Sequence, residues 1–120
     1  MMSDPSPQPT PVLVLVKDLL FSSKITATAR AAGVGTRLLR DPAQLGAEPS
    51  PRLIVDLNLP GAIAAAARWR TATGGTVIGF VSHVDTETIA AARAAGIDRV
   101  MARSRFVEEL PRLLTGDAIP

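Results

Sequence analysis

The carboxylate of Asp56 stands at a position in the sequence where an α/β protein could do chemistry. It follows residues 53–55, a run of branched apolar residues that is typical of a strand buried on both faces of a parallel sheet. In open α/β sheets, ligands bind outside the carboxyl ends of the strands, so Asp56 lies where such a fold has its functional site. Pro60 and Gly61 then close the loop and allow the next helix to begin.

Other predicted strands also end in residues that could act on a ligand. Lys17 and Asp18 follow the first predicted strand, Ser82 the fourth and Arg103 the fifth. A hydroxyl such as that of Ser82 can donate a hydrogen bond to a carboxylate. We expect Lys17 beside Asp56, because the first and third strands are predicted neighbours and an opposite charge favours the ionised carboxylate.

An alternation of strands and helices must position these side chains. The predicted strands cover residues 12–16, 36–40, 53–55, 76–81 and 99–102, and the predicted helices cover residues 22–32, 41–45, 62–72, 85–95 and 106–114. Ser22 or Ser23 is expected to cap the first helix, and residues 103–105 are expected to form a loop. This alternation predicts an α/β, flavodoxin-like three-layer sandwich with a five-stranded parallel sheet in the order 2-1-3-4-5.

The length of 120 residues fits one domain, which we place at residues 12–115. Residues 1–11 contain four prolines among polar residues and are predicted to be a disordered tail, and residues 116–120 a second tail. The longest apolar runs are far shorter than the roughly 20 residues that cross a bilayer, so we expect a cytoplasmic protein without membrane insertion.

The composition excludes several kinds of site. The chain has no cysteine and a single histidine, His83, which excludes disulfides, thiolate chemistry and a histidine metal cluster. His83 is expected to be a solvent-facing loop residue. The net charge is +2, and the charges are scattered and accompanied by few aromatic residues. We therefore expect no nucleic acid partner.

Residues 56–61, Asp-Leu-Asn-Leu-Pro-Gly, resemble the phospho-acceptor loop of bacterial response-regulator receiver domains, the family of the chemotaxis protein CheY. Further matches extend the resemblance over about 100 residues. In that family the pocket combines two acidic residues after strand 1, an acceptor Asp after strand 3, a Ser or Thr after strand 4 and a Lys after strand 5. The resemblance implies that Asp56 is the phosphoacceptor position and that Ser82 is the hydroxyl.

The departures from the family pattern affect the parts that neutralise charge. Phosphoryl transfer to a carboxylate needs Mg²⁺ and a cation against the growing negative charge. In one register Val16 and Lys17 replace the acidic pair, and in the other Lys17-Asp18 does so and one acid survives. Arg103 stands in place of the family's Lys, and Val100 replaces an aromatic residue that reports phosphorylation.

These features predict a degenerate receiver, or pseudo-receiver, that works by protein–protein interaction without Mg²⁺, without another cofactor and without enzymatic activity. Lys17 and Arg103 would then neutralise Asp56 permanently. An alternative is a phospho-accepting response regulator, in which a histidine kinase phosphorylates Asp56 with Mg²⁺. A third alternative, an enzyme or nucleotide binder on the same fold, has no Gly-rich phosphate loop to support it.

The resemblance also implies a partner face, made by the helix at 85–95, the strand at 99–102 and the last helix. The residues expected there are Thr88, Arg99, Val100, Arg105, Phe106 and Glu109. The last helix is predicted to be short enough to leave apolar surface for a signalling partner or for a homodimer. Trp69, between two arginines, is predicted to be part of the core, with a partner contact as the alternative.

Overall fold

A computed structural model of the chain describes residues 10–83 and 85–116, and its centre is a parallel sheet of five strands. The strands are β1 (Val12–Leu15), β2 (Thr36–Leu39), β3 (Arg52–Asp56), β4 (Thr76–Val81) and β5 (Arg99–Ala102), in the order β2-β1-β3-β4-β5. The predicted fold class and strand order are therefore confirmed. The predicted tails lie largely outside the described residues, although Pro11 is held by a 2.8 Å hydrogen bond from Ser50 Oγ to its carbonyl oxygen.

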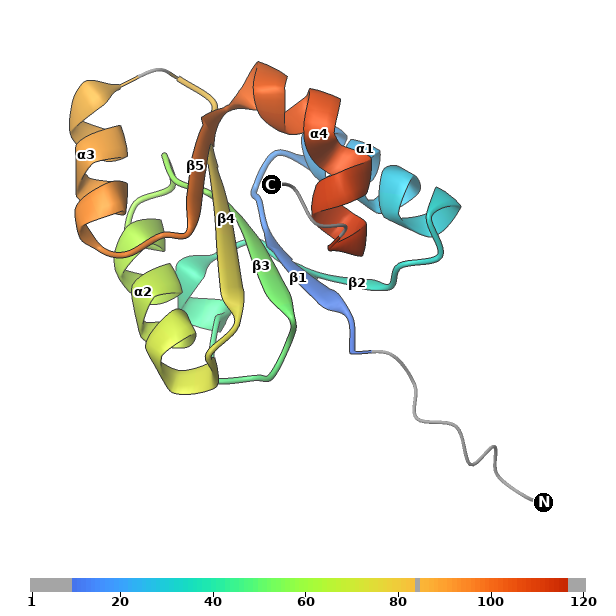
Figure 1. The fold of residues 1–120 in the computed structure, drawn as a ribbon, viewed down its shortest axis with the longest axis horizontal. Helices are drawn as coiled ribbons and strands as arrows, with labels where there is room; N and C mark the ends of the chain where they lie inside the picture. The colour runs from blue at the N-terminus through green and yellow to red at the C-terminus, as the bar shows by residue number, and fades with distance from the viewer. Residues whose placement is uncertain (1–9, 84, 117–120) are drawn as a thin grey trace.

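The helices form two layers around the sheet. They are α1 (Leu19–Ala31), α2 (Ala62–Thr73), α3 (Thr86–Ala94) and α4 (Arg103–Thr115), with one 3-10 turn, η1 (Pro42–Gln44). Helices α1 and α4 cover one face of the sheet, and α2 and α3 cover the other (Figure 1). Because all strands are parallel, their carboxyl ends meet at one edge of the sheet, where Asp56 and Ser82 lie.

Each layer of helices encloses its own core. Beneath α1 and α4 the three phenylalanines Phe21, Phe80 and Phe106 pack together, with ring centroids 4.7–5.9 Å apart. Beneath α2 and α3 the largest buried side chain is Trp69, whose indole N–H donates to the Glu48 carbonyl oxygen at 2.8 Å. Trp69 is 1% exposed, which confirms its predicted place in the core and excludes the alternative of a partner contact.

Helix α1 begins earlier than predicted, and its cap is Asp18 rather than Ser22 or Ser23. The Asp18 carboxylate accepts hydrogen bonds from the amides of Leu20 at 3.0 Å and Phe21 at 3.2 Å. This satisfies two of the amides that a helix leaves unpaired at its start. Ser22 is buried inside the first turns, and its hydroxyl donates to the Leu19 carbonyl oxygen instead.

Helix α4 is longer than predicted, because residues 103–105 form its first turn and not a loop. The predicted helix over 106–114 was too short. The apolar side chains Phe106, Leu110, Leu113 and Leu114 are all buried against the sheet and α1. The longer helix therefore uses its apolar stripe inside the domain, and the apolar surface that a short helix was expected to leave is not present there.

Candidate functional site

The Asp56 carboxylate and the Ser82 hydroxyl face each other at the ends of two neighbouring strands. Asp56 ends β3 and is half-buried, and Ser82 Oγ lies 3.3 Å from each of its two carboxylate oxygens. The pairing of Asp56 with Phe80 in the sheet brings Ser82 to this position. The structure thus brings together the predicted phosphoacceptor residue and the predicted hydroxyl.

Asn58 completes this arrangement, and the sequence analysis did not single it out. Its amide N–H donates to Asp56 Oδ1 at 3.0 Å, which closes the turn after β3. Its side-chain oxygen accepts hydrogen bonds from the amides of Ser82 at 2.8 Å and His83 at 3.2 Å. The clue was an Asn two residues after the acid, in a loop beside the end of the next strand. His83 itself is exposed, as predicted.

Leu57 anchors the Asp56 loop to strand β4. It is 3% exposed, and it packs against β4 at Gly79, where a Cβ atom would lie 2.6 Å from a Leu57 methyl group. A real Cβ atom would not fit there unless Leu57 moved. Gly79 therefore allows the residue next to Asp56 to pack closely on the neighbouring strand.

Lys17 does not form the predicted ion pair with Asp56. The ion pairs among residues 10–83 and 85–116 do not include Lys17, which is exposed and lines a cleft with Arg40 and Leu59. An ammonium group is strongly hydrated, and an exposed ion pair adds little stability, so nothing holds this flexible side chain over the carboxylate.

Arg103 also turns away from Asp56, contrary to the prediction. Its guanidinium carbon lies 3.8 Å above the centre of the Phe21 ring, and one of its nitrogens is 3.8 Å from Asp18 Oδ2. A guanidinium stacks well on an aromatic face, and this contact also places it beside the acid that caps α1. Asp18 and Arg103 therefore join α1 to α4, and among the described residues neither has an ion pair or a side-chain hydrogen bond with Asp56.

The donors in this region do not fit a magnesium site. Mg²⁺ takes oxygen ligands in near-octahedral geometry, commonly from one or two carboxylates. Across the described part of the chain, no group of three or more acidic, His or Cys side chains converges on a possible metal position. Asp18 is used as a helix cap, Val16 is buried in the core and Lys17 adds a positive charge nearby. The acid that follows β1 is thus bonded to the start of α1, and its neighbour is a cation rather than a second acid.

The predicted partner face carries charge rather than apolar surface. Glu109 on α4 lies 3.6 Å from Arg99 on β5 and also accepts a hydrogen bond from Arg105 one turn earlier. The hydrogen bond from Arg105 lowers the pKa of Glu109 below its usual value. Phe106 is fully buried and cannot contact a partner, and Val100 is half-buried.

The fold that carries this site is that of the receiver domains of two-component response regulators. A response regulator receiver domain (CheY-like) from Methanospirillum hungatei superposes with a TM-score of 0.74 at 13% identity, over 91% of this chain and 96% of that one. The receiver domain of an HD domain-containing protein from Pseudomonas fluorescens gives 0.75 at 17% identity, over 91% and 96%.

A structure of a response regulator from Burkholderia pseudomallei with a phosphorylated aspartic acid, calcium ion and citrate gives a TM-score of 0.73 at 19% identity. The match covers 88% of this chain and 66% of that protein. No protein-family model and no curated protein sequence matches the chain. Among the described residues, none of the helices has the length and apolar character needed to cross a bilayer.

Proposed function

We propose that the protein is a degenerate receiver domain that acts as a docking module in two-component signalling without Mg²⁺-dependent phosphorylation. The observation that carries the proposal is the use of Asp18 and Arg103. They are an acid and a cation that the receiver pattern would place near Asp56, and both contact α1 instead. Without a metal and a cation, repulsion opposes the transfer of a phosphoryl group to the carboxylate.

The proposed module has no cofactor and no catalytic activity of its own. The hydrogen bonds of Asp56 with Asn58 and Ser82 close its loop and tie it to the end of β4. A partner would then meet a constant surface rather than a switched one. The candidate surface is the charged face of β5 and α4, where Arg99, Arg105 and Glu109 lie. The proposal predicts that this surface binds either a signalling protein, in a partner complex, or a second copy of the chain, in a homodimer.

A second candidate function is a phosphorylated receiver that serves a histidine kinase. It is favoured by the pair of Asp56 and Ser82, which have the positions of acceptor and hydroxyl in the receiver fold. The response regulator from Burkholderia pseudomallei, which has this fold, carries a phosphorylated aspartic acid. The two candidates differ in whether Asp56 binds Mg²⁺.

Titration with Mg²⁺ and with beryllofluoride plus Mg²⁺ tests the proposal. The amide NMR signals of residues 56–61 are expected to show no saturable shift in the wild-type chain. Lys17→Asp, which adds a carboxylate and removes a cation at the end of β1, is the matched variant and is expected to bind Mg²⁺ more tightly than the wild type. Saturable binding by the wild type at micromolar Mg²⁺ would overturn the proposal.

A further inference from the structure

A small cleft opens at the carboxyl ends of β1, β2 and β3, beside the Asp56 loop. Its volume is about 260 Å³, and its lining residues are Lys17, Arg40, Asp41, Pro42, Leu59 and Pro60. Strand β1 lies between β2 and β3, so this is the point at which the strand order reverses. Open α/β sheets bind their ligands at such a point, outside the carboxyl ends of the strands.

The cleft has more positive than negative charge. Lys17 and Arg40 both line it, and neither side chain has an ion pair or a hydrogen bond in the part of the chain that the structure describes. Asp41 contributes the only carboxylate of the lining, and it accepts a hydrogen bond from the Ala43 amide at 2.9 Å. Two cations and one carboxylate leave a net charge of +1, and a bound anion would relieve the repulsion between the cations.

The frame of the cleft is held in place before any ligand binds. The Gln44 side-chain oxygen accepts hydrogen bonds from the backbone amides of Arg40 at 2.8 Å and Asp41 at 3.1 Å. Pro42 and Pro60 form parts of the wall, and their rings fix the backbone φ angle. Because the backbone of Arg40 is held in place, only the side chains of Arg40 and Lys17 have to become ordered when a ligand binds.

We propose that this cleft binds a small phosphate-bearing anion, held by the ammonium of Lys17 and the guanidinium of Arg40. A guanidinium binds two phosphate oxygens at once, and an ammonium adds a point charge. The volume lies below the roughly 300–1,000 Å³ typical of sites for drug-sized ligands, which favours orthophosphate or pyrophosphate over a whole nucleotide. The cation expected to neutralise Asp56 would thus serve an external anion, whether or not Asp56 is ever phosphorylated.

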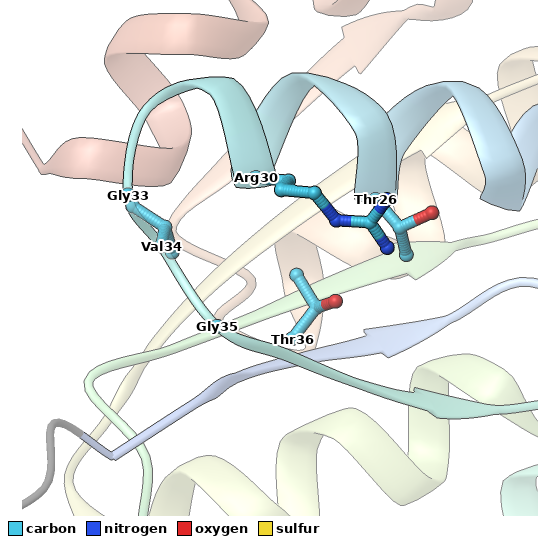
Figure 2. A pocket seen from close by; sticks show the side chains of 6 residues that line it. All are labelled: Thr26, Arg30, Gly33, Val34, Gly35 and Thr36. Atoms are coloured by element: carbon cyan, nitrogen blue, oxygen red, sulfur yellow. The ribbon is translucent and has the colours of Figure 1, made fainter.

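A second polar cleft provides an internal control. It has a volume of about 410 Å³, lies between α1 and the start of β2, and is lined by Thr26, Arg30, Gly33, Val34, Gly35 and Thr36. Arg30 extends back along α1 towards Thr26, with Thr36 on the other side of the cleft (Figure 2). This cleft has one cation instead of two, and it lies at the amino end of β2, away from the point where the strand order reverses.

The test is an NMR titration of the full chain with pyrophosphate in metal-free buffer, with sodium chloride at equal ionic strength as the reference. We expect saturable shifts of the amides at positions 17, 40 and 59, with Kd weakened at least tenfold in both Lys17→Gln and Arg40→Gln. Arg30→Gln, which alters the control cleft, should bind like the wild type. Both altered side chains of the proposed site are exposed, and a thermal melt of each variant verifies that it is folded.

Asp56→Asn separates this site from the Asp56 pocket. The proposal expects Asp56→Asn to bind pyrophosphate as the wild type does, since within residues 10–83 and 85–116 no ion pair joins Asp56 to Lys17 or Arg40. Three results would each overturn the proposal. These are equal shifts with chloride, an unchanged Kd in Lys17→Gln or Arg40→Gln, and loss of binding in Asp56→Asn. None of them bears on whether Asp56 binds Mg²⁺, so this site and the proposed function can fail separately.

Discussion

The two halves of the sheet's carboxyl edge differ in what their polar residues do. At the ends of β3 and β4, Asp56, Asn58 and Ser82 hydrogen-bond to one another. At the ends of β1 and β5, Asp18 and Arg103 contact the first turn of α1. The polar residues of the first half therefore bond to one another, whereas those of the second half hold the start of α1.

The difference follows from what a carboxylate and a guanidinium can contact at the start of α1. A carboxylate just beyond the end of β1 is well placed to cap a helix, which stabilises the fold by about 1 kcal/mol. An arginine in place of a lysine can stack on an aromatic ring, which a compact ammonium does less well. The cap stabilises the start of α1, and the contacts of Arg103 with Asp18 and Phe21 link α1 to α4.

The largest expected effect tests whether the side chains at the carboxyl ends of β1 and β5 stabilise the fold. Phe21 is 4% exposed, packs on Phe80 and Phe106, and carries Arg103 on its ring face. Phe21→Ala should lower the free energy of unfolding by about 3–5 kcal/mol, measured by urea denaturation. The adjacent Leu20 is 86% exposed, and Leu20→Ala should change it by less than about 0.5 kcal/mol. Equal effects of the two substitutions would contradict the structural role.

The next effect tests whether packing at the carboxyl ends of β3 and β4 holds the Asp56 loop in place. Gly79→Ala places a Cβ atom against Leu57 and should destabilise the fold by about 1–3 kcal/mol while shifting the amide signals of the Asp56 loop. Gly46→Ala is the control, because a Cβ atom there meets nothing within 4 Å. If Gly79→Ala left the signals of residues 56–58 in place, the packing of Leu57 would not be what holds the loop.

A smaller effect distinguishes a helix cap from a metal ligand. Asp18→Ala should lower the free energy of unfolding by about 1 kcal/mol, and Asp18→Asn should nearly restore it, because Asn caps helices as well as Asp does. Addition of Mg²⁺ should not change the urea denaturation midpoint of either variant. A stabilisation of the wild type by Mg²⁺ that Asp18→Asn abolishes would identify Asp18 as a metal ligand.

The smallest effect concerns a carboxylate at the opposite edge of the sheet, which serves as a reference for a purely structural acid. Asp98 accepts hydrogen bonds from Arg70 and from the Val77 amide, and the bond from Arg70 lowers the pKa of Asp98 below its usual 3.8. Its contribution to stability is present above the pKa of the unfolded chain and is lost as pH falls through the lower folded pKa.

The unfolding free energy of the wild type should therefore fall as pH decreases below about 4, with a shallower fall in Asp98→Asn. Urea denaturation at a series of pH values measures this. Arg70→Gln should also make the acid-side fall of the unfolding free energy shallower, because the hydrogen bond from Arg70 is the main cause of the lowered pKa of Asp98. An identical slope in wild type and Asp98→Asn would show that the carboxylate does not keep its Arg70 contact in solution.

Most of the fold follows from the sequence, because each buried strand is an apolar run followed by polar or turn-forming residues. The pattern predicts a parallel sheet, and the flavodoxin-like order and the nearness of Ser82 to Asp56 followed from the resemblance to receiver domains. The burial of Trp69 followed from the usual place of tryptophan in a core. The residues that link one element to the next were less predictable. Asp18 could have been a ligand or a cap, and residues 103–105 contain no proline or glycine that would mark a helix start.

The directions of Lys17 and Arg103 could not be read from the sequence at all. Both are long cations at strand ends, and sequence spacing fixes where such a side chain starts but not which neighbour its charged end reaches. Arg103 contacts Phe21, which is distant along the chain, and Lys17 lines a cleft with Arg40. Only the packing of α1 against α4 and the path of the chain after β2 determine those neighbours.

We propose that Asp56 occupies the acceptor position of a receiver fold but cannot hold a phosphoryl group. The most direct measurement is the intact mass of the chain after incubation with acetyl phosphate and Mg²⁺. The claim predicts an unmodified protein, indistinguishable from Asp56→Asn treated in the same way. A stable phosphoryl adduct that requires Mg²⁺ and disappears in Asp56→Asn would contradict it.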